Sequence, residues 1–443
     1  MLCWVWPCQA QLHLDVVETA DLRLIYQSPF QDHLVPHIAR NYQNSLQFHK
    51  KTLGWTPSEE TTIVLTDLTD YGNAGAVGAP YNGVVVYIAP SSRTLETLPG
   101  SEAIFMLMNH ELAHVGHIDV ANQRDLFWRR VFGGKPRQTD EHPESILYNY
   151  LTVPRLSAPR WYFEGAAVFM ETWMAGGVGR AQGAYDEMVF RAMVRDDAHF
   201  YSALGIVSEG VAIDFQTGTN AYLYGTRFIS YVALTYTPDK VLDWLGRDKS
   251  VERYYSTRFL QIFGVTLDAA WRDWIEWEKQ WQNANLARVR EHPLTPATAI
   301  TRRELGSISR SYFDATNNTM IGAFRYPGVV AHTGVLSLED DTVRHLADIK
   351  GPMKYRVTST AWDPDARTLY YTADNLAHRD LMAVNVDTGK AQQLIKDGRI
   401  GDIVVNPADK SIWGLRHLNG IVSLVRIPPP YREWNLVYAW PYG

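Results

Sequence analysis

The chain has 443 residues, of which 46% are hydrophobic and 12% aromatic, enough to form large buried cores in two or three domains. Its formal net charge is −6, and no long run of one charge sign occurs. Such a chain offers no basic surface for a phosphate backbone, so we expect no nucleic-acid partner. We also expect no membrane span, because no stretch reaches the roughly 18 apolar residues that a spanning helix needs.

The first eleven residues, MLCWVWPCQAQ, contain both cysteines of the chain, Cys3 and Cys8. The stretch is apolar and has small residues near Ala10, as a signal-peptidase site does, but it lacks the positively charged start of a complete signal. We interpret residues 1–11 as the remnant of an export signal, which predicts a periplasmic or extracellular protein without disulfides. The alternative is a first β-strand with two buried thiols.

Strand-like and helical segments alternate over the following part of the chain. The short apolar runs TTIVLTD (61–67) and GVVVYIAP (83–90) predict β-strands. The second run predicts either an edge strand, on which an extended peptide could lie as an added strand, or a buried interior strand. The sequence leaves these two alternatives open.

The stretch MLMNHELAHVGHIDV (106–120) carries three histidines and one glutamate in a predicted helix. His110 and His114 are four positions apart, so their rings lie about 40° apart around the helix and can reach one metal ion. Glu111 is turned by about 100° from His110, where it can reach a water on that metal but cannot easily join the same ligand set. The spacing H-E-x-x-H is typical of zinc peptidases.

A tetrahedral catalytic zinc needs a third protein ligand. His117 lies about 10.5 Å along the helix from His110, too far to share one metal. The metzincin pattern also fails, because His117 and Val120 stand where that pattern requires Gly and His. The stretch APRWYFEGAAVFMET (158–172) predicts a second helix, with small residues that allow close helix packing, and its Glu164 is our candidate third ligand.

The series His110-Glu111-x-x-His114, followed by Trp161-x-x-Glu164-Gly165-x-Ala167, resembles the gluzincins. It is similar in particular to the peptidase-MA-like domains that precede TolB-like propellers in exported bacterial proteins. The resemblance covers roughly residues 20–285 and implies an α+β zincin-like metallopeptidase domain over residues 12–290, mostly helical in its C-terminal half. It also implies one Zn²⁺ bound by the three candidate ligands, with Glu111 as the general base that activates a zinc-bound water.

Gluzincins often stabilise the developing oxyanion with a Tyr or His from a downstream helix. The segment NAYLYGTRF (220–228) offers Tyr222 and Tyr224, and the adjoining Gly225 lets this helix pack closely on a neighbour. We expect Tyr224 to be catalytic, with core packing as the alternative for both tyrosines. Candidates to orient a ligand imidazole are His117, Asp119 and Glu171, of which His117 is better explained by capping or packing.

Two features depart from the compact gluzincins. The 50 positions from His114 to Glu164 exceed their usual spacing, so we expect an inserted segment at 122–153 that shapes the cleft. The Gly-x-Met-x-Asn signature with which gluzincin aminopeptidases hold an amine is absent from residues 71–83. Its absence favours an endopeptidase.

Helical periodicity dominates from about residue 220 to residue 284. The last helix of this region carries four tryptophans on one face, which we expect to pack in the core: Trp271, Trp274, Trp277 and Trp281. Near residue 290 the helical signals stop. Short alternating strands separated by Asp, Asn, Pro and Gly continue to the C-terminus.

This C-terminal region contains a repeat of a large apolar residue, a polar turn and a strand, at 313–324, 362–373 and 405–416. The spacings from Asp314 to Asp363 and on to Asn406 are 49 and 43 residues, the length of one four-stranded propeller blade. Intervening segments predict the outer hairpins of the blades, at 334–347 and 381–395. Residues 291–443 therefore resemble an incomplete TolB-like β-propeller of about three blades.

Closed propellers typically have four to eight blades, and an open set exposes strand edges. The final stretch PPPYREWNLVYAWPYG (428–443) predicts the lead into another blade. We therefore expect the sequence to be a fragment of a longer protein. The alternative is a short form whose ring is completed by a partner or a second copy.

These features predict an exported zinc metallopeptidase that acts on a peptide or protein substrate, with a propeller that recruits substrate or an envelope partner. The alternative is a catalytically inactive zincin scaffold that serves propeller-mediated protein interaction in the cell envelope. Glu111 favours the peptidase, because a closed structural zinc site has no use for a general base.

Overall fold

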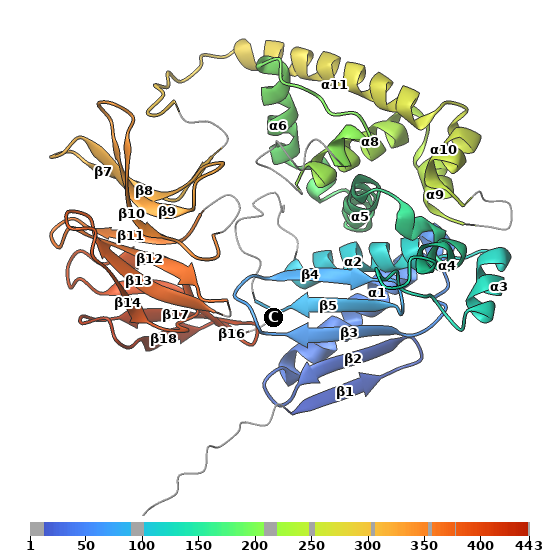
Figure 1. The fold of residues 1–443 in the computed structure, drawn as a ribbon, viewed down its shortest axis with the longest axis horizontal. Coiled ribbons are helices and arrows are strands. Elements are labelled where there is room, and N and C mark those ends of the chain that lie inside the picture. The colour runs from blue at the N-terminus through green and yellow to red at the C-terminus, as the bar shows by residue number, and fades with distance from the viewer. Residues whose placement is uncertain are drawn as a thin grey trace, which may run out of the picture.

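The computed structural model describes residues 13–89, 102–207, 219–247, 253–302, 306–352, 357–376 and 378–441. A helix-rich α+β part extends to Arg290, and an all-β part follows it (Figure 1). This order agrees with the predicted fold class. The predicted remnant of an export signal, residues 1–11, lies outside the described residues. Among the described helices, none is both long and apolar enough to cross a membrane.

The N-terminal part begins with a five-stranded sheet in the order β1-β2-β3-β5-β4. Strands β2, β3 and β5 are parallel, whereas β1 and β4 pair antiparallel at the two edges. The predicted strand at 83–90 is therefore interior, and β4 is an edge strand of the sheet. The bounds of the strands are β1 (Leu14–Glu18), β2 (Leu22–Gln27), β3 (Thr61–Thr66), β4 (Asn73–Val77) and β5 (Gly83–Tyr87).

Helices α1 and α2 pack on this sheet, and the remaining helices build a second layer against α2 (Figure 1). Glu102 caps α2, because its carboxylate accepts hydrogen bonds from the backbone N–H groups of Ile104 and Phe105. The helices are α1 (Val35–Leu53), α2 (Ala103–Asp119), α3 (Gln123–Val131), α4 (Ser145–Thr152), α5 (Arg160–Met174), α6 (Ala184–Arg195), α8 (Asn220–Thr235), α9 (Pro238–Leu245), α10 (Tyr255–Phe263) and α11 (Leu267–Arg290). Short 3₁₀ helices are η1 (Asp32–Leu34), η3 (Pro154–Ser157) and η4 (Arg180–Gln182).

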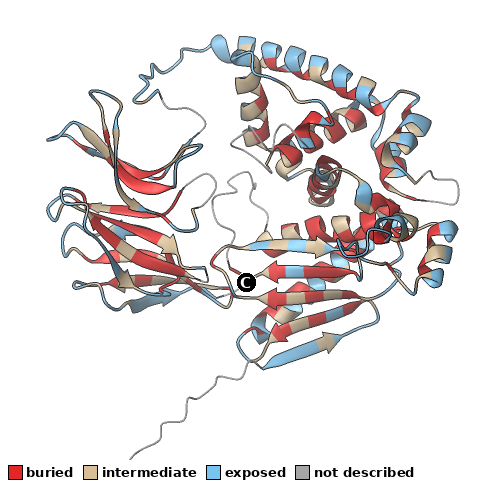
Figure 2. Cartoon of the chain, viewed as in Figure 1, coloured by how far each residue is buried: buried red, intermediate tan, exposed pale blue. Residues whose placement is uncertain are grey.

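An aromatic core holds the second layer together, and Figure 2 shows that much of α5 and α8 is buried. Trp161 of α5 and Trp271 of α11 are fully buried with ring centroids 4.9 Å apart, and their indole N–H groups donate to the carbonyls of Ala203 and Tyr201. Truncating such a side chain to Ala typically costs about 3–5 kcal/mol. Of the four tryptophans predicted to pack in the core from α11, Trp271 and Trp274 are buried, whereas Trp281 is 44% exposed.

Helices α5 and α8 cross at a pair of facing glycines, Gly165 and Gly225. A Cβ atom at Gly165 would overlap the backbone of Gly225, and one at Gly225 would overlap the carbonyl group of Trp161. Only glycine permits backbones to approach this closely. The close packing predicted from the small residues after Glu164 is thus present, and it brings the first turn of α8 beside Glu164.

The C-terminal part consists of three consecutive antiparallel sheets, each with the strand order of a propeller blade. Blade one contains β6 (Ser307–Ile308), β7 (Tyr312–Asp314), β8 (Thr319–Arg325), β9 (His332–Ser337) and β10 (Val343–Asp348). Blade two contains β11 (Thr360–Asp363), β12 (Thr368–Asp374), β13 (Arg379–Asn385) and β14 (Ala391–Ile395). Blade three contains β15 (Ile400–Val405), β16 (Ile412–Leu418), β17 (Ile421–Ile427) and β18 (Asn435–Ala439).

Apolar clusters join blade one to blade two and blade two to blade three. The predicted hairpins lie where the repeat places them, with 334–347 spanning β9 and β10 and 381–395 spanning β13 and β14. Residues 435–439 of the last stretch form β18, which pairs with β17 as the outer strand of blade three. That this stretch leads into another blade stays a prediction.

We predict that Gly225→Ala destabilises the N-terminal part, because the added methyl group meets rigid backbone at the crossing of α5 and α8. Overpacking of this kind costs about 1–3 kcal/mol or more of folding free energy. Thermal unfolding followed by circular dichroism measures the change. Gly75→Ala is the matched control, since a Cβ there meets nothing within 4 Å. Equal midpoints for the two variants would contradict the close contact.

Candidate metal centre

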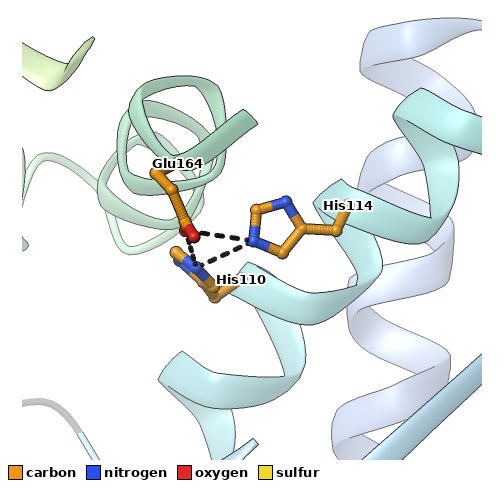
Figure 3. A group of neighbouring side chains, drawn as sticks. All are labelled: His110, His114 and Glu164. Atoms are coloured by element: carbon orange, nitrogen blue, oxygen red, sulfur yellow. Dashed lines mark hydrogen bonds and ion pairs between the residues drawn. The ribbon is translucent and has the colours of Figure 1, made fainter. Parts of the chain in front are cut away.

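The structure brings His110 and His114 of α2 together with Glu164 of α5 (Figure 3). The Nε2 atoms of the two histidines are 3.1 Å apart, and each lies 3.3 Å from Oε2 of Glu164. In the part of the chain that the structure describes, no other group of three such side chains converges in this way. The three residues selected from the sequence as metal ligands thus point at one place.

This donor set fits zinc. A tetrahedral zinc with bonds of about 2.0–2.2 Å holds its ligand atoms roughly 3.3 Å from one another, close to the three distances between these side chains. Burial raises the pKa of Glu164, but its hydrogen bonds with the two histidines outweigh burial and lower the pKa below its ordinary value. The carboxylate is therefore ionised and able to bind a cation.

A buried ion pair fixes the orientation of the His110 ring. Nδ1 of His110 lies 2.8 Å from Oε2 of Glu171. Glu171 follows Glu164 by two helical turns and lies on the same face of α5. Arg180 of η4 donates to both carboxylate oxygens of Glu171, at 2.7 and 2.8 Å. With Nδ1–H donating to Glu171, Nε2 of His110 faces the centre with its lone pair, as a metal ligand must.

The charges around His110 compensate one another. Burial lowers the pKa of His110, but hydrogen bonds with Glu164 and Glu171 outweigh it and raise the pKa to about 9. Burial likewise raises the pKa of Glu171, but the charges and hydrogen bonds of Arg180 and His110 together outweigh burial and lower the pKa. The raised pKa of His110 indicates that the surrounding carboxylates favour a positive charge at this place.

Glu111 lies on α2 directly after His110 and is only 5% exposed. Its position on the helix turns its carboxyl away from the line that joins His110 and His114. Among the described residues, it is not one of the three converging donors.

The structure supports core packing, the alternative role, for Tyr224, which was expected to be catalytic. Its ring is 1% exposed and stacks on Trp271 at 6.4 Å between centroids, within the aromatic core. Tyr222, the other candidate, lies at the centre instead, with its ring stacked on His110 at 6.1 Å. Burial and the Glu164 carboxylate, to which its hydroxyl donates, raise the pKa of Tyr222.

Two arginines complete the site and were not anticipated from the sequence. The guanidinium groups of Arg160 and Arg180 lie 5.7 and 5.5 Å from the centre of the Tyr222 ring. Arg160 also donates to Oε1 of Glu164 at 3.3 Å. Arg160 could have been found from the sequence, because it lies four residues before Glu164 on one helix. Arg180 could not, because it reaches the site from a glycine-rich loop that has no periodic pattern.

Two of the residues considered as orienting groups have structural roles. His117 is fully buried and packs near Tyr162, as expected from its position. Asp119 does not reach a ligand imidazole, because its carboxylate accepts from Arg129 and Lys135 at the C-terminal end of α2. Both basic residues belong to the segment 122–153, which therefore secures the end of α2.

Comparisons with known proteins give no family for this chain. No family model matches it, and no curated protein does. Solved propeller structures resemble its C-terminal part only. TolB from Acinetobacter baumannii is 12% identical with a TM-score of 0.26, over 30% of this chain and 32% of that one.

Two further solved structures are similar to a like extent. The β-propeller domain of the Trilobed protease from Pyrococcus furiosus is 8% identical with a TM-score of 0.23, over 32% of this chain and 44% of that one. A chain of a nidogen–laminin complex is 12% identical with a TM-score of 0.25, over 30% and 48%. This chain thus spans less than half the length of each of these structures. No functional argument rests on similarity this slight, and the gluzincin resemblance stays a prediction.

We predict that Glu164→Ala sharply weakens metal binding, because it removes one of three converging donors, whereas His117→Ala does not. Zinc content of the purified chain, measured by atomic emission after dialysis, should be about one ion per wild-type chain and far less in the Glu164 variant. Loss of the metal in the His117 variant, with retention in the Glu164 variant, would show that the ligand assignment is wrong.

Proposed function

We propose that the chain is a zinc-dependent peptidase whose metal is held by His110, His114 and Glu164. The observation that carries the proposal is the convergence of two imidazole nitrogens and one carboxylate oxygen within 3.3 Å of one another, with Glu111 next to them on α2. A structural zinc site is closed by four protein ligands. Here three donors converge in the described residues, which leaves a position for reactants.

The side chains divide the chemistry between them. Bound zinc would polarise the scissile carbonyl and lower the pKa of a water molecule. Glu111 accepts the proton of the attacking water and then delivers it to the nitrogen of the leaving amine. Tyr222 keeps its proton at neutral pH, since the ordinary pKa of tyrosine is about 10 and burial raises it further. Its hydroxyl can therefore donate to the developing oxyanion.

The free edge of strand β4 is an argument for a peptide substrate. It pairs with β5 on one side and has no other neighbour among the described strands, so its outer backbone groups are available to an extended peptide. The strand packs on α2, the helix that carries the two histidines. An extended peptide along β4 is held over its length and not by a terminus, which supports an endopeptidase.

Export to the periplasm or the cell exterior is part of the same proposal and derives from the apolar, cysteine-containing N-terminus. The propeller then supplies a surface for a protein substrate or an envelope partner. The competing function, an inactive zincin scaffold, requires the same fold and the same metal ligands but no general base. The role of Glu111 therefore distinguishes the two functions.

We predict that Glu111→Gln retains zinc and fold but loses turnover by about two to four orders of magnitude, because the amide keeps the shape and lacks the basicity. Cleavage of a quenched peptide library, with and without a chelator, measures the loss. Glu276→Gln on the exposed face of α11 is the control and should match wild type. Full activity of the Glu111 variant would refute the mechanism, and inactivity of wild type on every peptide would support the scaffold.

We further predict that Tyr222→Phe lowers kcat by about a hundredfold or more with little change in KM, since the lost hydroxyl acts on the transition state. Tyr224→Phe should change thermal stability and leave kcat near the wild-type value, because that ring lies in the aromatic core. Steady-state kinetics on one peptide compares the two variants. The reverse pattern would restore Tyr224 as the catalytic residue.

A further inference from the structure

One loop of the N-terminal part is held by the propeller. Residues 67–72 connect β3 to the edge strand β4, and Figure 1 shows the ends of the blades beside this end of the sheet. Asp70 is 2% exposed, and its two main partners, Arg379 and Arg399, are 7% and 5% exposed. Buried charges of this kind persist only when they are paired and hydrogen-bonded.

Arg399 binds both acidic residues of the loop. Its Nη1 and Nη2 atoms donate to the two carboxylate oxygens of Asp67 at 2.6 and 2.9 Å, and its Nε donates to Asp70 at 2.7 Å. A guanidinium group has the planar set of donors that such a double contact needs, whereas an ammonium group does not. The backbone N–H of Asn419 also donates to Asp67, at 2.9 Å.

The other blades contact the same loop. The backbone N–H of Arg379, at the start of β13, donates to Asp70 at 2.7 Å, and its guanidinium donates to the Asp70 carbonyl at 2.9 Å. The Tyr71 hydroxyl donates to the carbonyl of Gly351, in the connection between blades one and two, at 3.1 Å.

All of these contacts come from one end of the propeller. In antiparallel blades, the turn between the second and third strands and the connection to the next blade lie at the same end. Arg379 and Asn419 lie at turns between the second and third strands of a blade. Gly351 and Arg399 lie in the connections from one blade to the next. The loop therefore occupies the place where the ends of three blades meet.

The held loop leads directly into β4, with only Gly72 between Tyr71 and the first residue of the strand. At the other end of β4, Gly78 packs against Ile118 of α2 so closely that a Cβ atom would overlap that side chain. Strand β4 is thus fixed at one end by the propeller and at the other end by the helix that carries the histidines.

We propose that Asp67, Asp70 and Arg399 are positioning residues, through which the propeller sets β4 at the spacing from α2 that an extended peptide needs. The proposal rests on the proposed peptidase function for its consequence in catalysis. Its structural part, that the blades fix the edge strand, stands independently of any activity.

The test uses Arg399→Lys in the full-length chain, which keeps the charge but removes the double contact. Hydrogen exchange should become roughly tenfold faster in peptides that cover β4, with zinc content unchanged. If the chain is active, KM for a long peptide should rise roughly tenfold while kcat stays within about twofold. Asp67→Asn, a milder change at the rim of the same cluster, should show a smaller shift in the same direction.

Arg367→Gln is the matched control, because Arg367 also binds two aspartates, Asp314 and Asp387, but within blades one and two. It should leave exchange in β4 unchanged. Wild-type exchange in β4 of a folded Arg399 variant would overturn the proposal, as would an equal effect of the Arg367 variant. Because exchange and zinc content need no substrate, failure of the peptidase function would be seen separately, as inactivity of the wild type.

Discussion

Helices α5 and α8 meet at two glycines, and the distance between their backbones there determines the geometry of the whole centre. Glu164 precedes Gly165 in α5, and Tyr222 lies one turn before Gly225 in α8. A side chain at either glycine would separate the helices and withdraw the tyrosine hydroxyl from the carboxylate. The aromatic core around Trp161 then holds the crossing in place, so the geometry of the candidate metal centre and the packing of the core depend on the same contact.

The propeller also contacts the N-terminal part of the chain. The loop 67–72 of the same chain lies at one end of its three blades, where it contacts Gly351, Arg379 and Arg399. Strand β18 is exposed along its whole length and includes Leu436, Val437 and Tyr438. The N-terminal part and the propeller are joined by a buried ion cluster, which is a more specific connection than a flexible linker between independent modules.

Much of the fold and three of the site residues could be predicted from the sequence, because they follow from periodicity within one element. His110 and His114 share a helical face, Glu164 and Glu171 repeat over two turns of α5, and the blades repeat at nearly constant length. The choice between Tyr222 and Tyr224 could not be made in this way. Side chains two residues apart on a helix point roughly 200° apart. Which of them faces the candidate metal centre depends on how α8 is rotated against α5. Arg180 and the Asp70 cluster depend on contacts between segments distant in sequence, which no local pattern records.

We propose that one zinc ion lies between α2 and α5. Anomalous diffraction at the zinc absorption edge, on crystals grown with zinc, would locate it. We expect one strong peak per chain, with bonds of about 2.0–2.2 Å to Nε2 of His110, Nε2 of His114 and a carboxylate oxygen of Glu164. A peak held by other residues, or no peak between these three side chains at saturating zinc, would contradict it.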